Sequence, residues 1–255
     1  VVPQRIADIV RGIAQACSQV GVALVGGETA EHPGLLGPDD YDVAGAAVGV
    51  VEADRMLGTE KVQVGDVVLG MASSGLHSNG YSLVRHILAE NKIGYHDNLA
   101  EFGGVVGEVL LEPTRLYTGP LVELLADEKI GKAVHALSHV TGGGIAANLA
   151  RVLPVGSWVE VDRSTWSPSP VFRVLTDLAG ESLESTEGTW NLGLGQALVV
   201  DAARATQVAA ALTSAGINTW QLGVIAEMPA DASSYVQGAK GVDGGAVRLV
   251  GEYAN

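Results

Sequence analysis

Short apolar runs alternate with segments of helical periodicity along most of this chain, and that alternation leaves few folds open. The clearest unit is an apolar run at 67–72 followed by helix spacing at 81–90. Elements that alternate in this way pack as layers, with helices covering the faces of a sheet. We therefore predict an α/β protein of α+β type with mixed sheets, organised as two domains.

The expected elements follow from the spacing of apolar residues. Helices are predicted at 4–18, 81–90, 145–152, 170–178 and 204–215, with a further helix that has Pro113 in its first turn. Strands are predicted at 22–25, 41–51, 67–72, 157–162, 196–200 and 219–226. Irregular residues at 91–112 indicate a boundary between domains of residues 1–100 and 101–255, and the residues from about Ala230 are expected to form a loose tail with a short terminal strand.

Composition supports a folded enzyme-sized core and excludes some partners. Of the 255 residues 47% are hydrophobic and 17% charged, which excludes a disordered chain. The net charge of -14 disfavours nucleic acids and anionic membranes as partners. The single cysteine, Cys17, suits a reducing compartment and is expected in the core. With no apolar run of membrane-spanning length and no leader pattern, we expect a cytoplasmic protein.

The first of three glycine-rich segments follows the predicted strand at 22–25. Gly26 and Gly27 would let the backbone turn sharply and approach a ligand, with Thr29 beside them. Glu28 and Glu31 supply carboxylates within one turn, which is a pattern that can coordinate Mg²⁺. A tight turn with solvated acids explains the segment equally well, so both interpretations stay open.

The second segment joins the predicted strand at 67–72 to the helix at 81–90. A helix N-terminus offers unpaired N–H groups to an anion, and Gly75 lets the chain come close. Ser74, Ser78 and Asn79 add side-chain donors, and one of the last two is expected to cap the helix. His77 is a candidate general acid–base group or a donor to a phosphoryl oxygen. The alternative is a capping loop with an exposed histidine.

The third segment combines His139 and Thr141 with the glycines Gly142, Gly143 and Gly144 before a predicted helix. Three consecutive glycines are costly to order, so they indicate close approach of the backbone to another group. With the helix behind them they form a second candidate anion cradle. The alternative is a flexible turn.

Other patterns are weaker or missing. Asn191 opens a GxG pattern before a strand, which alone means little. The sequence contains no HExxH, CxxC or GxSxG motif and no Walker-type phosphate loop. An ATP site here would therefore be of another type, and no metal ligands are assigned.

In this order the segments resemble the phosphoribosylformylglycinamidine cyclo-ligase family, also called aminoimidazole ribonucleotide synthetases. The matching strings are ALVGGETAEHPG, YDVAGAAVGVVE, GDVVLGMASSGLHSNGYSLVR, LLEPTRLY, LSHVTGGGIAANLARVLP, VDRSTW and TWNLGLGQALVV, which run from about residue 4 to residue 226. The combination is specific, whereas any one string is shared with relatives in the same ATP-binding superfamily.

The resemblance implies a fold of two α/β domains, the first for ATP binding and dimerisation. It implies ATP-dependent cyclisation of formylglycinamidine ribonucleotide to aminoimidazole ribonucleotide in purine biosynthesis, with ATP and Mg²⁺ as cofactors and a homodimer as the working form. It implies no nucleic-acid or membrane partner. Glu28, His77 and His139 would be the catalytic groups. The substrate and phosphate groups would be bound by Gly26, Gly27, Thr29, Ser74, Gly75, Ser78, Asn79, Thr141, Gly142, Gly143, Gly144 and Asn191.

One departure from the family pattern concerns the start of the chain. Family members begin with a lysine-containing glycine loop and an aspartate motif, and neither occurs here. We therefore expect a first domain truncated at its N-terminus and a chain that is inactive alone. Two alternatives stay open: another ATP-dependent synthetase of the superfamily, similar to selenophosphate synthetase, or a non-catalytic dimeric body.

Overall fold

The computed structural model describes residues 2–231, 233–238 and 243–254. The chain forms two compact units, Val1–Met56 and Leu57–Asn255, which are described separately. This division differs from the boundary predicted at 91–112. Residues 67–72 share one sheet with strands that follow residue 112, so the segment from 57 to 100 packs with the rest of the larger unit.

The smaller unit contains one long helix, α1 (Pro3–Gln19), where the apolar spacing predicted it. Cys17 on this helix is half-buried rather than part of a core. The strands predicted at 22–25 and 41–51 are wrong for the described chain, because both segments lack regular secondary structure. A strand needs a hydrogen-bonded neighbour. No described strand pairs with either segment, and Val48 and Val50 are 97% and 98% exposed.

The larger unit is built on a seven-stranded sheet in the order β4-β6-β1-β7-β5-β9-β8. Its strands are β1 (Val67–Ala72), β4 (Val134–His139), β5 (Ser157–Asp162), β6 (Leu194–Val200), β7 (Thr219–Glu227), β8 (Val236–Gln237) and β9 (Ala246–Val250). Neighbouring strands are antiparallel except for β5 and β9, which run parallel. The predicted class, α/β with a mixed sheet, is confirmed.

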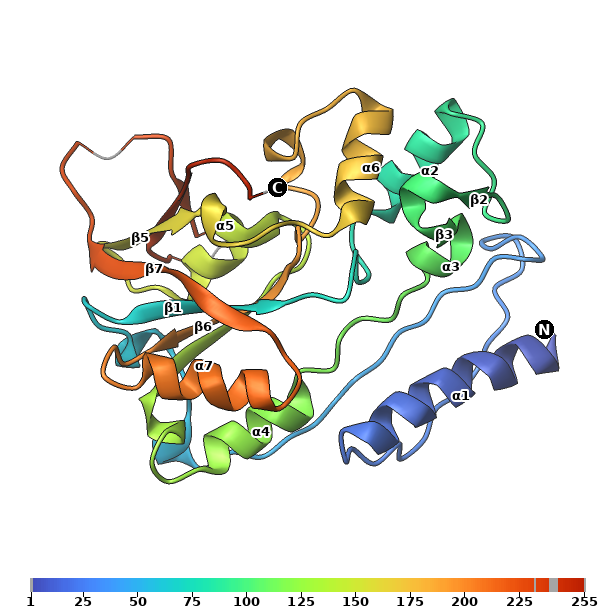
Figure 1. Ribbon diagram of the computed structural model, residues 1–255. Helices are drawn as coiled ribbons and strands as arrows, with labels where there is room; N and C mark the ends of the chain where they lie inside the picture. The colour runs from blue at the N-terminus through green and yellow to red at the C-terminus, as the bar shows by residue number, and fades with distance from the viewer. Residues whose placement is uncertain (1, 232, 239–242, 255) are drawn as a thin grey trace. The chain divides into compact units, whose positions relative to one another are not determined.

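Helix α5 packs on one face of this sheet and α7, with α4 beside it, on the other (Figure 1). The helices of the larger unit are α2 (Tyr81–Glu90), α3 (Val106–Leu110), α4 (Thr118–Ala126), α5 (Gly144–Leu149), α6 (Pro170–Ala179) and α7 (Ala205–Ser214). Alternate side chains of β1 enter different cores: Leu69 and Met71 pack with α4 and α7, whereas Val68 packs with α2, α5 and α6. This is the period of two expected for a strand buried on both faces.

One prediction near these elements is wrong. Pro113 lies in an irregular stretch, where its carbonyl accepts a hydrogen bond from Ser74 Oγ, and α4 begins only at Thr118. The short terminal strand predicted after Ala230 is confirmed as β9, but Ala246 and Val247 of this strand are fully buried beside β5, so this part of the chain is not loose. Residues 232, 239–242 and 255 of that predicted tail lie outside the described residues.

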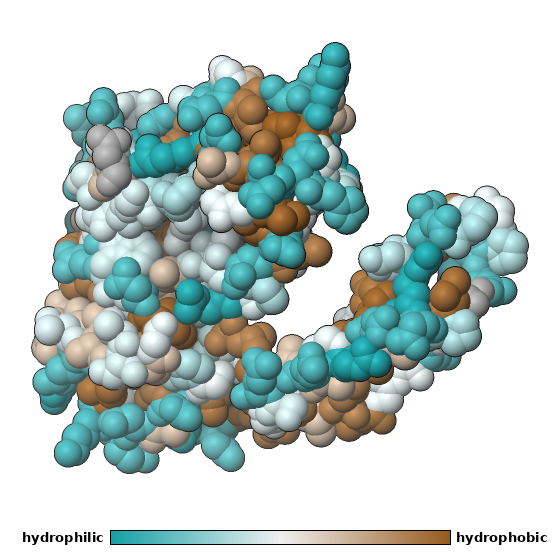
Figure 2. Space-filling model, turned by 45° about the vertical axis from the view of Figure 1, so that its right-hand side comes forward, coloured by the Kyte–Doolittle hydropathy of each residue, from teal (hydrophilic) through white to brown (hydrophobic). Residues whose placement is uncertain are grey.

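The surface mixes polar and apolar side chains, as Figure 2 shows in teal and brown. Exposed apolar residues occur on both units, among them Val25, Val48 and Val50 in the smaller one and Val155 in the larger. Among the described residues, no helix has the length and apolar character needed to cross a bilayer.

Candidate functional site

Sheet pairing brings the second and third glycine-rich segments together. Strand β6 lies between β1 and β4 and runs antiparallel to both. The ends of β1 and β4 therefore meet at the start of β6, where Gln196 pairs with Met71 on one side and His139 on the other. We call the loops at this edge, residues 73–80, 113–117, 138–144 and 191–195, the strand-end site.

Three rings form the centre of the strand-end site. His77 is 4% exposed, and its ring centroid lies 6.4 Å from that of the exposed His139. Tyr117 lies edge-on to both, at 6.1 Å from His77 and 6.2 Å from His139, and its hydroxyl donates to the carbonyl of Ala72 at 2.8 Å. Sequence reasoning singled out both histidines but not Tyr117. Two features of the sequence could have pointed to Tyr117: only 5% of the residues are aromatic, and Tyr117 lies within a string that carries the family resemblance.

The hydrogen bonds of His77 determine which of its nitrogens carries the proton. The backbone N–H of Ser74 donates to His77 Nε2 at 3.2 Å, and that of Arg115 does so at 3.5 Å. An acceptor nitrogen carries no proton, so we assign the proton of the neutral ring to Nδ1. Nδ1 is buried and has no partner among the described residues. His77 therefore offers a buried N–H donor to a group that the described residues do not supply.

The surroundings keep His77 uncharged. Burial, followed by the charges of His139 and Arg115, lowers the pKa of His77 to about 4. Burial also raises the pKa of Tyr117, which stays a neutral hydroxyl. Of the two roles predicted for His77, this environment favours a neutral hydrogen-bond donor over a group that exchanges protons near pH 7.

The pKa of His77 makes stability depend on pH. In the unfolded chain the ring titrates near 6.5 and in the folded chain near 4, so between these values the unfolded state binds more protons. We expect the free energy of unfolding to fall as pH is lowered from 6.5 towards 4. A His77→Asn variant lacks this contribution. Urea titrations of both proteins across that range should show the steeper loss in the unsubstituted protein, and parallel losses would contradict the assignment.

Two further polar atoms near His77 have no protein partner. Ser73 Oγ and Arg115 Nε are buried and unpaired among the described residues, like His77 Nδ1. Leaving a buried donor unpaired costs about 1–3 kcal/mol, so each of these atoms is a candidate partner for a ligand or water oxygen. Phosphate and amide oxygens are acceptors of this kind.

Gly195, the second residue of β6, makes room for the rings. A Cβ on Gly195 would lie 2.0 Å from Tyr117 Oη and 2.6 Å from His77 Cε1. Asn191 is buried, donates from Nδ2 to the carbonyl of Gly75 at 2.8 Å, and accepts from the N–H of Gly193 at 2.9 Å. The GxG pattern and its asparagine thus have a packing role in the structure.

The N–H groups of the third segment are already paired within the protein. Gly142 donates to Asn79 Oδ1 at 3.0 Å, Gly143 to the carbonyl of Gly188 at 3.1 Å, and Gly144 to that of Thr141 at 3.1 Å. The predicted cradle of free amides at 142–144 is therefore not present, and α5 behind it is only six residues long. Gly143 and Gly144 have a left-handed backbone, and Gly144 also lies tightly against the backbone of Glu187.

The predicted cap of α2 is also wrong. Gly80 is the N-cap residue, with φ of 74°, and no side chain caps the helix. A Cβ at Gly80 would lie 2.4 Å from Trp190 Nε1, so this position must stay small. Ser78 and Asn79 make other bonds: Ser78 Oγ lies 3.3 Å from Thr114 Oγ1, and Asn79 holds Gly142.

The first segment belongs to the smaller unit. Gly26, Gly27, Glu28 and Thr29 are exposed there and lie outside regular secondary structure. Among the described residues, no three His, Cys, Asp or Glu side chains gather as a metal site. The roles of these residues, and the metal ligands, stay predictions.

Two family models match the chain, one on each side of its structural division. The family model described as AIR synthase related protein, N-terminal domain, matches residues 2–51, and the C-terminal domain model matches residues 63–235. The gap between them contains the structural division at Met56 and Leu57. A solved thiamine-monophosphate kinase from Stenotrophomonas maltophilia K279a has a TM-score of 0.49 at 18% identity, covering 80% of this chain and 56% of that one.

Two similar curated relatives carry the same name. The phosphoribosylformylglycinamidine cyclo-ligase of Sorangium cellulosum (strain So ce56) is 47% identical over 221 residues, which is 85% of this chain and 62% of that relative. The cyclo-ligase of Limosilactobacillus fermentum (strain NBRC 3956 / LMG 18251) is 42% identical over 236 residues, covering 92% of this chain and 67% of that relative. The chain thus spans about two thirds of their length. The resemblance predicted from the motifs is confirmed, and the chain belongs to the AIR synthase related family.

Proposed function

We propose that this chain is part of a phosphoribosylformylglycinamidine cyclo-ligase, which uses ATP to close the ring of formylglycinamidine ribonucleotide. The observation that carries the proposal is the meeting of His77 and His139, on two family-matching segments, with their ring centroids 6.4 Å apart. Sequence identity of 47% to a curated cyclo-ligase supports the same reaction. We place the protein in the cytoplasm, where a lone cysteine stays reduced.

In this reaction ATP phosphorylates the amide oxygen of the substrate, a nitrogen attacks the same carbon, and phosphate leaves. The protein's contribution is position and charge compensation. The buried Nδ1–H of His77 would donate to an oxygen of the substrate or of the phosphoryl group. The Arg115 side chain would add positive charge beside it, since its Nε is also unpaired among the described atoms. Tyr117 would fix the orientation of both histidine rings.

ATP would be used with Mg²⁺, which shields the phosphate charges when bound. The described residues contain no cage of three protein ligands. Mg²⁺ at phosphate-transfer sites takes one or two carboxylates plus phosphate and water oxygens, so such a cage is not required. We propose Glu28 in the smaller unit as one carboxylate ligand, and Gly26, Gly27 and Thr29 as residues that approach the phosphates.

The assay that tests the proposal uses the complete gene product with formylglycinamidine ribonucleotide and ATP. We expect ADP, phosphate and aminoimidazole ribonucleotide in equal amounts. A folded protein that consumes ATP only with another acceptor, such as selenide, would favour the synthetase alternative. A folded dimer with no turnover on either acceptor would favour the non-catalytic alternative.

We also propose a homodimer that pairs the segment at 41–51 with the same segment of a second copy. This segment is apolar, outside regular secondary structure and exposed, so its backbone is accessible to a partner strand. Pairing would bury its apolar side chains and would form the strand that the apolar run predicts.

The dimer proposal predicts the effect of a charge in this segment. Val48→Asp would place a carboxylate in the paired strand, and we expect the dimer dissociation constant to rise at least about tenfold, or 1.4 kcal/mol. Sedimentation equilibrium measures the change. Val155→Asp is the control, because Val155 is 74% exposed in the larger unit. Equal dissociation constants for the two variants would contradict pairing through 41–51.

A further inference from the structure

Five consecutive residues, 187–191, contact both glycine-rich loops of the strand-end site, and we call them the bridging segment. On the side of His139, the carbonyl of Gly188 accepts the N–H of Gly143 at 3.1 Å. The backbones come so close there that a Cβ on Gly144 would lie 1.5 Å from the carbonyl oxygen of Glu187. Any shift of the bridging segment therefore moves the loop at 142–144.

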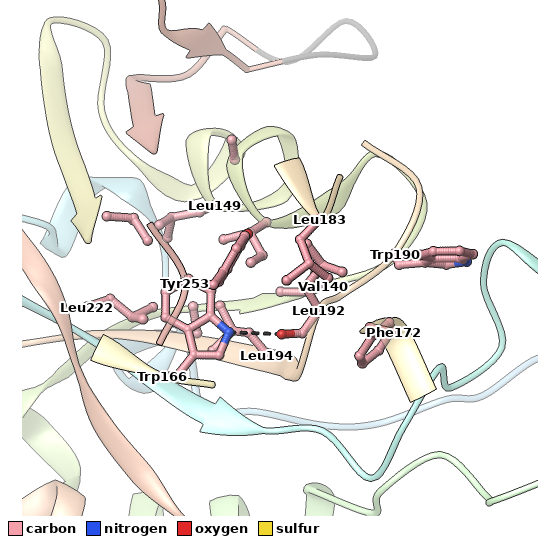
Figure 3. Packing of buried hydrophobic residues seen from close by; sticks show 14 of the residues in the cluster. Val140, Leu149, Trp166, Phe172, Leu183, Trp190, Leu192, Leu194, Leu222 and Tyr253 are labelled. Carbon is pink, nitrogen blue, oxygen red and sulfur yellow. Dashed lines mark hydrogen bonds between the residues drawn. The ribbon is translucent and has the colours of Figure 1, made fainter. Parts of the chain in front are cut away.

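On the side of His77, the bridging segment packs against the other loop. Gly80 faces Thr189 and Trp190, to which an added Cβ would lie 3.0 Å and 2.4 Å. Asn191 Nδ2 donates a hydrogen bond to the carbonyl of Gly75 at 2.8 Å. Trp190 is fully buried and its ring centroid lies 6.2 Å from that of Phe172, so the bridging segment enters the core at Trp190 (Figure 3).

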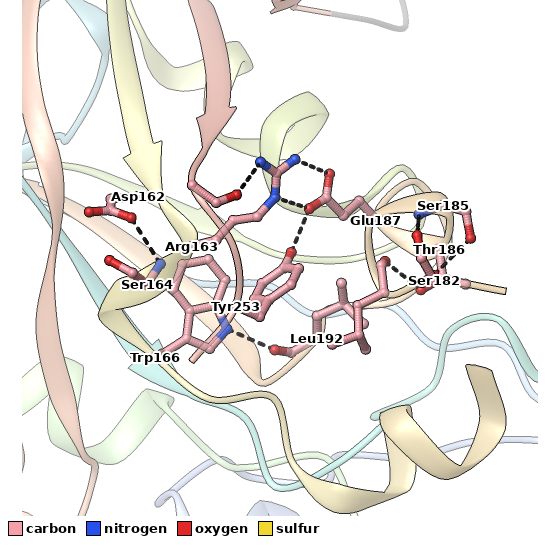
Figure 4. A network of polar contacts seen from close by, with 12 residues as sticks. Asp162, Arg163, Ser164, Trp166, Ser182, Ser185, Thr186, Glu187, Leu192 and Tyr253 are labelled. Atoms are coloured by element: carbon pink, nitrogen blue, oxygen red, sulfur yellow. Dashed lines mark hydrogen bonds and ion pairs between the residues drawn. The ribbon is translucent and has the colours of Figure 1, made fainter. Parts of the chain in front are cut away.

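Glu187, at the start of the bridging segment, is held by Arg163 and Tyr253, and we call these three side chains the clamp. Arg163 donates to both carboxylate oxygens of Glu187, from Nε at 2.6 Å and from Nη2 at 3.0 Å. Tyr253 donates its hydroxyl to the same carboxylate at 2.7 Å (Figure 4). Arg163 also donates from Nη1 to the carbonyl of Gly251 at 3.1 Å, so the clamp ties the end of the chain to the bridging segment.

The charges of the clamp are sheltered from water. The Arg163 and Glu187 side chains are only 14% and 15% exposed. The hydrogen bond to Glu187 raises the pKa of Arg163, and burial together with Glu187 raises that of Tyr253, so Arg163 stays charged and the tyrosine stays protonated at neutral pH. Removing one partner of such a pair leaves the other charge buried and uncompensated. The clamp is therefore sensitive to the loss of any single member.

We propose that Glu187 is a positioning residue of the strand-end site. Its carboxylate, held by Arg163 and Tyr253, sets the place of the bridging segment, which in turn sets the two loops that carry His77 and His139. The catalytic consequence rests on the function proposed above. A displacement of about 1 Å in a reacting group can cost roughly a hundredfold in rate, so a residue that touches no substrate can control turnover.

Three variants of the complete protein test this role. Glu187→Gln removes the charge, and Tyr253→Phe removes only a hydroxyl, because the ring keeps its packing on Trp166 at 5.2 Å. Glu160→Gln is the matched control: Glu160 pairs with Arg248, another link to the C-terminal segment, on strands away from the glycine loops.

Hydrogen exchange of the Gly143 amide, followed by NMR, reports the contact with Gly188. We expect exchange to accelerate about tenfold or more in Glu187→Gln and by a smaller factor in Tyr253→Phe, with no change in Glu160→Gln. The amides of β6 should keep their protection in all three. Should Glu187→Gln not fold, Tyr253→Phe alone carries the comparison. Gly143 exchange equal to the control, or acceleration spread evenly over β6, would overturn the proposal.

Kinetics separates positioning from simple support of the fold. At equal folded fraction, kcat/KM should fall about tenfold to a hundredfold in Glu187→Gln, and Glu187→Asp should recover part of the loss. A loss that matches only the unfolded fraction would overturn the positioning role. If the unsubstituted protein lacks cyclo-ligase activity, the proposed function is contradicted. The hydrogen-exchange experiment needs no turnover, so its result still decides the role of the clamp.

Discussion

Replacing Gly144 by alanine is expected to lower the free energy of unfolding of the Leu57–Asn255 unit by about 3 kcal/mol or more, the largest stability effect we predict. Two costs combine at this residue. Its φ is +73°, which disfavours a side chain, and its Cβ would lie 1.5 Å from the backbone oxygen of Glu187. Backbone cannot rotate away as a side chain can, so α5 or the bridging segment must move. Urea unfolding followed by circular dichroism measures the loss.

Gly180→Ala is the control for that measurement. Gly180 has a similar φ, +67°, but an added Cβ meets nothing within 4 Å. Only the conformational cost of about 1–2 kcal/mol should appear there. The difference between the two variants then isolates the close approach of Gly144 to the bridging segment. Equal losses would contradict the tight packing described for this loop.

The largest effect on activity is expected at His77. His77→Ala removes the Nδ1–H donor, and we expect kcat/KM to fall by about a hundredfold to a thousandfold, the usual cost of losing a donor at a developing negative charge. His77→Asn should recover at least about tenfold of this, because its amide NH₂ can take the place of Nδ1–H and asparagine tolerates the residue's φ of 59°. Steady-state assays of the three proteins make the comparison.

The same pair of variants separates a donor from an acid–base group. An asparagine can donate a hydrogen bond but cannot exchange a proton near neutral pH. Were His77→Asn as inactive as His77→Ala, His77 would be acting through proton transfer and not as a neutral donor. The His77 pKa of about 4 favours the role of a neutral hydrogen-bond donor, because the His77 ring is already uncharged at pH 7.

Much of the larger unit could be predicted from local pattern. The apolar run at 67–72 and the helix spacing at 81–90 gave the bounds of β1 and α2, because each element follows from its own residues. The strand order could not be predicted, since it depends on contacts between residues far apart in sequence. The strands expected at 22–25 and 41–51 show the same limit: an apolar run becomes a strand only beside a partner.

Only part of the candidate site's geometry could be predicted from the sequence. Sequence reasoning expected His77 and His139 in one site, and the structure brings their rings together. It also expected glycine-freed amides as the anion donors, whereas the amides of Gly142 and Gly143 already have acceptors. A glycine in the sequence indicates that another group lies close to the backbone. Only the fold shows that the group next to Gly143 is the backbone carbonyl of Gly188. Tyr117 and Arg163 lie in strings that carry the resemblance, but the roles of Tyr117 and of the clamp were missed, because they depend on contacts between residues far apart in sequence.

The most direct test of the neutral histidine donor is a nitrogen-15 NMR spectrum of the histidine rings at pH 7, recorded with and without formylglycinamidine ribonucleotide and Mg²⁺-ATP. We predict that His77 shows an unprotonated Nε2 and a protonated Nδ1, and that the Nδ1 resonance moves when the ligands bind. A doubly protonated His77, a proton on Nε2, or an Nδ1 signal unchanged by saturating ligand would contradict it.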